Sequence, residues 1–177
     1  PDVQADLGIE SSFAGIETIQ KRLTPCVAEK MAAKSGRPDV LLVRHVLEHT
    51  HDTRAALNWA SHLVQPNGYI VLEVPDATRA LERLDYTTVW EEHVVYFTPT
   101  TMRGCLERNG FEIVSLDSHP YTLENSLVVI ARASRPPRTD PASPSEIIRG
   151  ARFVREFPRV RARIHEQLRD QGRIAML

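Results

Sequence analysis

Two short, strongly apolar runs, separated by one helix-length segment, constrain the fold of this 177-residue chain more than any other feature. The runs are residues 39–43 (DVLLV) and 69–74 (YIVLEV). Asp52 can cap a helix between them, and a turn at 66–68 (PNG) closes that helix. The helix carries apolar side chains at helical spacing: Ala56, Leu57, Ala60, Leu63 and Val64. We therefore expect a strand–helix–strand unit in a sheet buried on both faces.

The remaining segments continue the alternation of strands and helices. Thr24-Pro25 and Thr98-Pro99 each combine a helix cap with a proline at the first helical position. Residues 16–19, 111–116 and 126–131 are the other strand candidates. The order predicts an α/β fold whose sheet is mostly parallel and ends in an antiparallel pair.

The carboxyl-terminal part differs in composition from the rest of the chain. We expect a sheet domain over 1–134, a proline-rich linker over 135–145 and an amphipathic helical segment over 146–177. Pro158 predicts a kink or a break in that helix. Residues 173–177 resemble the start of a further strand. Both ends of the chain look cut, so we expect an interior segment of a longer protein. The helix has an apolar stripe of Phe153, Phe157, Val160, Ile164 and Leu168.

Composition excludes several classes of protein. A formal net charge of −1 argues against general electrostatic binding to nucleic acid or to a membrane. No apolar run is long enough for a transmembrane helix, and no secretory signal is recognisable. The two cysteines, Cys26 and Cys105, form no CxxC pair, so neither a zinc module nor a redox motif is expected. We expect a cytoplasmic protein.

Three motifs resemble those of a known enzyme family. Residues 39–49 (DVLLVRHVLEH) and 63–73 (LVQPNGYIVLE) are similar to the middle of the class I S-adenosylmethionine-dependent methyltransferases. Residues 92–97 (EHVVYF) resemble a segment of the C-methyltransferases that act on nucleotide-linked keto-deoxysugars. The resemblance spans residues 18–132. It implies a Rossmann-like sheet lacking its first βα unit, S-adenosylmethionine as cofactor, a small-molecule substrate and methyl transfer through an enolate.

The resemblance also implies roles for individual residues. His93 is the expected general base, Glu92 orients it, and His49 holds the developing enolate oxygen. The remaining contacts are expected from Arg44, His45 and Val46 to the methionine part of the cofactor, from Gln20 to its adenine, and from Trp90 and Tyr96 to the substrate.

The chain departs from the family pattern in four places. It contains no G-x-G loop, and the acidic residue that binds the cofactor ribose would precede Pro1. The four-cysteine zinc module of the family is absent, and Trp90-Glu91 replaces a Tyr-His pair. We therefore expect the 177-residue chain by itself to bind S-adenosylmethionine weakly or not at all.

Some patterns allow a simpler interpretation. Residues 45–49 match H-x-x-E-H, but they straddle a strand end and a loop instead of one helix face, so we expect no metal site from this motif. Glu92-His93 could be a surface pair, and His49 could pack under a loop. The arginine-rich segment 149–173 could bind phosphate or nucleic acid, but a solvated helix face is the more common meaning. The alternatives to sugar C-methylation are an O- or N-methyltransferase and a non-catalytic partner-binding module.

Overall fold

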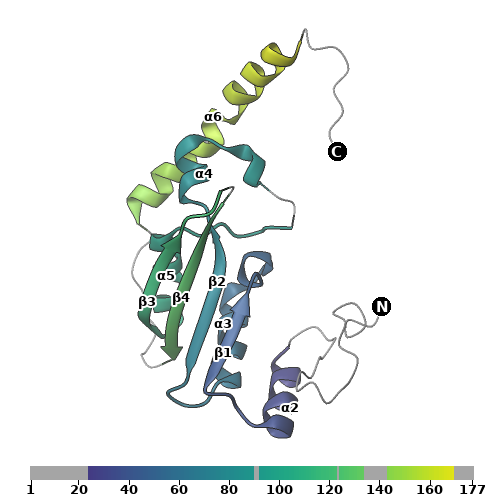
Figure 1. Cartoon of the computed structure of the whole chain (residues 1–177), viewed down its shortest axis with the longest axis vertical. Helices are drawn as coiled ribbons and strands as arrows, with labels where there is room; N and C mark the ends of the chain where they lie inside the picture. Colours follow the sequence, from purple (N-terminus) through teal and green to yellow (C-terminus); the bar gives the residue numbers. More distant parts are fainter. Residues whose placement is uncertain (1–23, 90–91, 123, 134–142, 170–177) are drawn as a thin grey trace, which may run out of the picture.

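A four-stranded sheet forms the centre of the molecule. The computed structural model describes residues 24–89, 92–122, 124–133 and 143–169. The strands are β1 (Val40–Arg44), β2 (Tyr69–Asp76), β3 (Phe111–His119) and β4 (Asn125–Ala133), in the order β1-β2-β4-β3 (Figure 1). The α/β class is confirmed. The strand candidates at 16–19 and 173–177 lie outside the described residues.

The sheet is less parallel than the sequence predicted. Strand β1 pairs with β2 in parallel, whereas β4 pairs antiparallel with both β2 and β3. The β3–β4 hairpin causes this arrangement, because its second strand returns beside β2. The predicted terminal antiparallel pair is confirmed, but "mostly parallel" fits only the β1–β2 pair among the described strands.

The predicted helices begin at the predicted caps. They are α2 (Pro25–Ser35), α3 (Thr53–Leu63) and α5 (Pro99–Arg108). The side chains of Thr24, Asp52 and Thr98 each accept a hydrogen bond from a backbone N–H of the first turn. Between β2 and α5 the chain adds elements that the sequence did not predict: α4 (Thr78–Arg83) and the short 3-10 helix η3 (Tyr86–Thr88).

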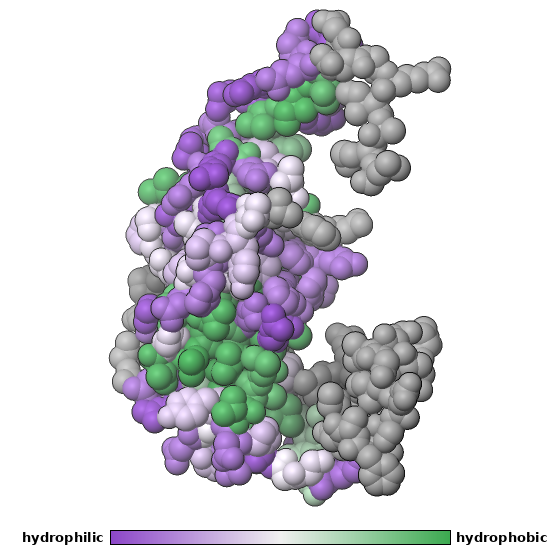
Figure 2. All heavy atoms as spheres, viewed as in Figure 1, coloured by the Kyte–Doolittle hydropathy of each residue, from purple (hydrophilic) through white to green (hydrophobic). Residues whose placement is uncertain are grey.

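The two faces of the sheet are buried to different extents. Helices α3 and α5 pack on one face, where Leu72 and its cross-strand partner Val129 are at most 1% exposed. On the other face Val40 and Leu42 remain more than half exposed. Figure 2 shows this second face as an apolar patch over the strands. The expectation that β1 is buried on both faces is therefore wrong for the described residues, where only Val43 of this strand is buried.

The last described helix, α6 (Pro144–Leu168), extends beyond the sheet (Figure 1). It is one continuous helix that contains Pro158, so the predicted alternative of a break is wrong. It begins two residues before the expected boundary at 146. None of its side chains is buried, and Arg149 and Arg159 pair with glutamates three residues away, as on a solvated helix face. Among the described helices, none combines the length and the apolar character needed to cross a membrane.

Candidate active site at the carboxyl end of β1 and β2

The chain turns sharply where β1 ends. His45 adopts a left-handed backbone conformation with φ 51°, which costs a non-glycine residue about 1–2 kcal/mol. Its N–H donates to the carbonyl of Glu73 at 2.9 Å, so the turn is attached to β2. The 3-10 helix η2 (Leu47–His49) follows at once. The turn thus places Glu48 and His49 beyond the carboxyl ends of the parallel strands, where open α/β sheets bind ligands.

A second segment, residues 92–97, lies against η2. The backbone N–H groups of Val94 and Val95 both donate to the carbonyl of Glu48, at 2.9 and 3.1 Å. Further along, the N–H of Ala77 donates to the carbonyl of Phe97 at 2.8 Å. These backbone contacts hold the segment at the end of the sheet and so determine where its side chains lie.

The docked segment brings the predicted site residues together. The rings of His49 and His93 meet edge to face, with their centroids 4.8 Å apart, although the two residues lie far apart in the sequence. The ring of Tyr96 lies 6.2 Å from that of His93. Tertiary contact therefore joins three of the residues that the resemblance implied.

The backbone of Glu92 orients His49. The Nδ1 atom of His49 lies 2.9 Å from the carbonyl oxygen of Glu92. A carbonyl can only accept, so Nδ1 carries the hydrogen and Nε2 is the nitrogen left for chemistry. The sequence instead assigned the Glu92 side chain, which is exposed, to the orientation of His93. That role stays a prediction.

A buried carboxylate lies beside these imidazoles. Glu48 is 2% exposed, and its Oε1 is 3.3 Å from His45 Nδ1 and 3.9 Å from His49 Nε2. Its Oε2 has no hydrogen-bond partner among the described residues. Glu48 was not among the residues predicted from the sequence, because its burial depends on the docking of residues 92–97 and not on its local motif.

An ion pair crosses the strands next to this group. Arg44 Nε donates to Glu73 Oε2 at 2.5 Å, and the other carboxylate oxygen accepts from Ser126 on β4 at 3.0 Å. The hydrogen bond from Arg44 lowers the pKa of Glu73 against the opposing effect of burial. The same contact raises the pKa of the Arg44 guanidinium.

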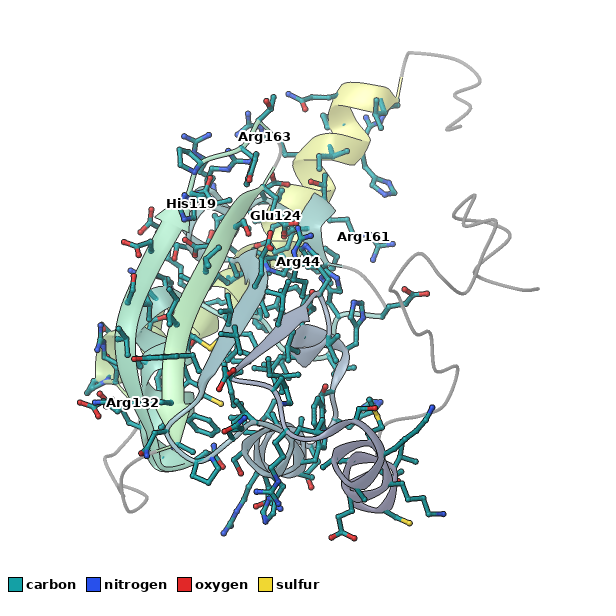
Figure 3. All side chains as sticks on the ribbon, turned by 60° about the horizontal axis from the view of Figure 1, so that its bottom comes forward. Arg44, His119, Glu124, Arg132, Arg161 and Arg163 are labelled. Carbon is teal, nitrogen blue, oxygen red and sulfur yellow. The ribbon has the colours of Figure 1, made fainter. Side chains whose placement is uncertain are left out.

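The β3–β4 turn supplies a carboxylate, Glu124, that was not predicted from the sequence. Burial raises the pKa of Glu124, while the charges of His93 and His45 act in the opposite direction. Figure 3 labels Arg44 and Glu124 at the same end of the sheet, with Arg132 at the other end. Arg79 holds the turn, because its guanidinium donates to the carbonyls of Tyr121 and Thr122 at 3.2 and 3.4 Å.

The expected cofactor contacts are only partly described. Arg44, His45 and Val46 lie where β1 ends, and Val46 is 42% exposed. Gln20 and Trp90 lie outside the described residues. The H-x-x-E-H match forms no helix face, since His45 is left-handed and η2 begins only at Leu47, as the strand-end interpretation predicted.

Comparisons with known proteins show the family of the chain. A family model described as a methyltransferase domain matches residues 4–116. C-methyltransferase NovU from Streptomyces niveus is 30% identical over 165 residues, covering 88% of this chain and 39% of NovU. The chain thus spans about two fifths of the length of that curated relative.

One solved structure was also found to be similar. It is magnesium protoporphyrin IX methyltransferase from Synechocystis PCC 6803 with bound SAH, at 18% identity and a TM-score of 0.43, covering 58% of this chain and 48% of that chain. The family assignment comes from the sequence comparison, which matches well over half of this chain. The chain therefore belongs to the methyltransferase-domain family, among the class I S-adenosylmethionine-dependent methyltransferases.

Proposed function

We propose that the protein containing this chain transfers a methyl group from S-adenosylmethionine to a carbon of a nucleotide-linked keto-deoxysugar. The observation that carries the proposal is the edge-to-face contact of His49 and His93 at the carboxyl end of the sheet. The similarity to a protein named as a C-methyltransferase supports a carbon acceptor. A cytoplasmic setting belongs to the same proposal.

The residues at the end of β1 fit the methionine part of the cofactor in their chemistry. Arg44, with 56% of its side chain exposed, offers a guanidinium to a carboxylate. Val46 offers exposed apolar surface to the aliphatic chain. When bound, S-adenosylmethionine supplies an electrophilic methyl group.

His93 acts as the general base in this proposal. A carbon next to a keto group becomes nucleophilic only after it loses a proton, and an imidazole suits that step near neutral pH. His93 is partly buried, and its ring lies near those of His49 and Tyr96. The proton moves from the substrate carbon to a ring nitrogen of His93.

His49 stabilises the charge that develops on the substrate oxygen. Its Nδ1 contacts the Glu92 carbonyl, which leaves Nε2 for the substrate. An Nε2–H could donate to the enolate oxygen. The resulting cationic ring would have its counter-charge in Glu48, 3.9 Å away.

Replacement of His93 by asparagine in the full-length protein tests the proposal. With a nucleotide-linked keto-deoxyhexose, His93→Asn should lower kcat by about 10²–10⁴, the usual contribution of a positioned base. It should also slow exchange of the acidic substrate proton with deuterated water, which needs the base but no methyl transfer. Binding of S-adenosylmethionine should not change.

His62→Asn is the matched control, because His62 is an exposed histidine of α3 whose Nδ1 contacts the Asn58 carbonyl of its own helix. Near-normal turnover and exchange in His93→Asn would return Glu92-His93 to a structural role. Methyl transfer by the wild type without any substrate exchange would indicate an oxygen or nitrogen acceptor instead.

A further inference from the structure

Three side chains with metal-ligating atoms converge beyond β1 and β2. A carboxylate oxygen of Glu48 and ring nitrogens of His49 and His93 all lie within 4.8 Å of one another. In the part of the chain that the structure describes, no other group of three or more histidine, cysteine or acidic residues converges in this way. Two imidazoles and one carboxylate form a ligand set typical of zinc-type ions.

The hydrogen bonding of His49 prepares one ligand. Metal-binding histidines usually donate their second ring N–H to a carbonyl or carboxylate, which fixes both the tautomer and the ring orientation. His49 does so through Nδ1 to the Glu92 carbonyl at 2.9 Å. Its Nε2, 3.9 Å from Glu48 Oε1, is therefore the nitrogen presented to an ion.

The burial of Glu48 provides independent support. A carboxylate that is 2% exposed loses its hydration, and this loss is unfavourable unless a cation or several donors replace the water. His45 Nδ1 lies 3.3 Å from Oε1, but Oε2 has no hydrogen-bond partner among the described residues. A positive ion at this position would supply the missing interaction.

We propose that Glu48, His49 and His93 bind one divalent transition-metal ion of the zinc type. Tetrahedral bonds of 2.0–2.1 Å separate ligand atoms by about 3.3–3.4 Å, so side-chain rotations that shorten the separations by up to about 1.5 Å complete the site. Water takes the fourth position. These ligands differ from the H-x-x-E-H set, because His45 is replaced by His93 from a segment far along the chain.

Metal binding has a consequence that rests on the proposed function. The ion uses a ring nitrogen of His93, which can then no longer accept a substrate proton. The metal-bound protein is accordingly the inactive form, and zinc at the site inhibits methyl transfer.

The binding itself is tested on the 177-residue chain without cofactor or substrate. We expect titration with CoCl2 to produce the visible absorption of a four-coordinate cobalt site at one equivalent, and ZnCl2 to displace the cobalt. His49→Asn and His93→Asn should each weaken binding at least tenfold. Both positions are at least partly exposed, so these variants should stay folded, which circular dichroism verifies.

His62→Asn and His119→Asn are the controls, since both are exposed histidines outside the cluster, and they should bind cobalt like the wild type. Absence of saturable binding by the wild type at about 100 μM cobalt, or equal affinity in His49→Asn and His93→Asn, overturns the proposal. In the full-length enzyme zinc should lower turnover, and a chelator should restore it. Loss of cobalt binding in a His93→Asn variant that keeps its turnover would contradict the proposed base but not the metal site.

Discussion

At the scale of single residues, one backbone conformation decides where the site lies. His45 is left-handed, and this turn moves Glu48 and His49 away from the line of β1. The His45 side chain also lies 3.3 Å from Glu48 and 3.8 Å from Glu73. The strained backbone of His45 thus lies in the turn that brings the site residues together. Strained backbone is common at functional sites.

Substitutions at His45 should separate backbone strain from side-chain contacts. Glycine adopts positive φ without steric cost, whereas a β-branched residue does so poorly. We expect His45→Gly to keep the free energy of unfolding within about 1 kcal/mol of the wild type, and His45→Val to lower it by about 1–3 kcal/mol. Urea unfolding measures both. Equal losses in the two variants would show that the ring contacts, and not φ, dominate at this position.

The two acidic residues with shifted pKa values should give opposite pH dependences. The pKa of Glu124 is raised in the fold above its usual 4.5, so its charged form is unfavourable there. Glu124→Gln should stabilise the chain above that raised pKa, and the gain should vanish as the pH falls below about 4.5. The pKa of Glu73 is lowered, so its contribution exists above 4.5 and is lost as the pH falls through the lowered value.

Glu73→Gln is therefore the matched comparison for Glu124→Gln. It should destabilise the chain at neutral pH, and its effect should diminish in acid. Urea unfolding between pH 3 and 8 measures both differences. If both variants instead changed the free energy of unfolding in the same direction with pH, the net charge of the chain, and not the local contacts of each carboxylate, would control its stability in acid.

At the scale of elements, the sheet has one protected and one accessible face. Leu72 is 1% exposed under α3 and α5, whereas Leu42, on the neighbouring strand, is 59% exposed. Leu72→Ala should lower the free energy of unfolding by about 2–5 kcal/mol, because it leaves a cavity. Leu42→Ala should lower it by less than about 1 kcal/mol. Similar losses in urea unfolding would show that the second face is covered in solution.

Local signals predicted the elements whose ends are determined by local contacts. Thr24, Asp52 and Thr98 cap helices where the sequence placed them, because each cap bonds to the first turn of its own helix. The 3-10 helices and the docking of segment 92–97 were not predictable in the same way. They depend on hydrogen bonds such as Val94 N–H to the Glu48 carbonyl, between residues far apart in the chain.

In the candidate site, too, the sequence indicated the residues that lie in local motifs but not those whose properties depend on tertiary structure. Family motifs indicated His49 and His93, because both occur in recognisable local patterns. Glu48 and Glu124 acquire their properties from burial, which no local pattern encodes. The strand position of β4 beside β2 likewise depends on the hairpin as a whole.

At the scale of the whole molecule, the first half of α6 contacts other described parts of the chain. Near its start, Glu146 accepts from Thr98 at 3.1 Å, and Arg149 pairs with Glu82 at 3.5 Å. Further along, Tyr86 donates to the Phe153 carbonyl at 2.7 Å. The Tyr86 ring also packs on Phe153 and Phe157, with centroids 4.3 and 5.0 Å apart. Beyond this point Ile164 and Leu168 are each more than two fifths exposed.

Removal of the Tyr86 side chain should loosen the second half of α6 and leave the rest intact. With no buried side chain of its own, α6 depends on these contacts to resist local opening. Tyr86→Ala should increase amide hydrogen exchange from Phe153 onward by at least about tenfold, since one hydrogen bond and two ring contacts together exceed about 1.4 kcal/mol. The polar contacts of Glu146 and Arg149 should keep the first turns protected, and exchange in β2 and β4 should not change.

Tyr121→Ala, at a tyrosine that is 63% exposed, is the matched control and should alter neither region. Unchanged protection after Phe153 in Tyr86→Ala would mean that the helix is held by its own hydrogen bonds and not by its contact with η3.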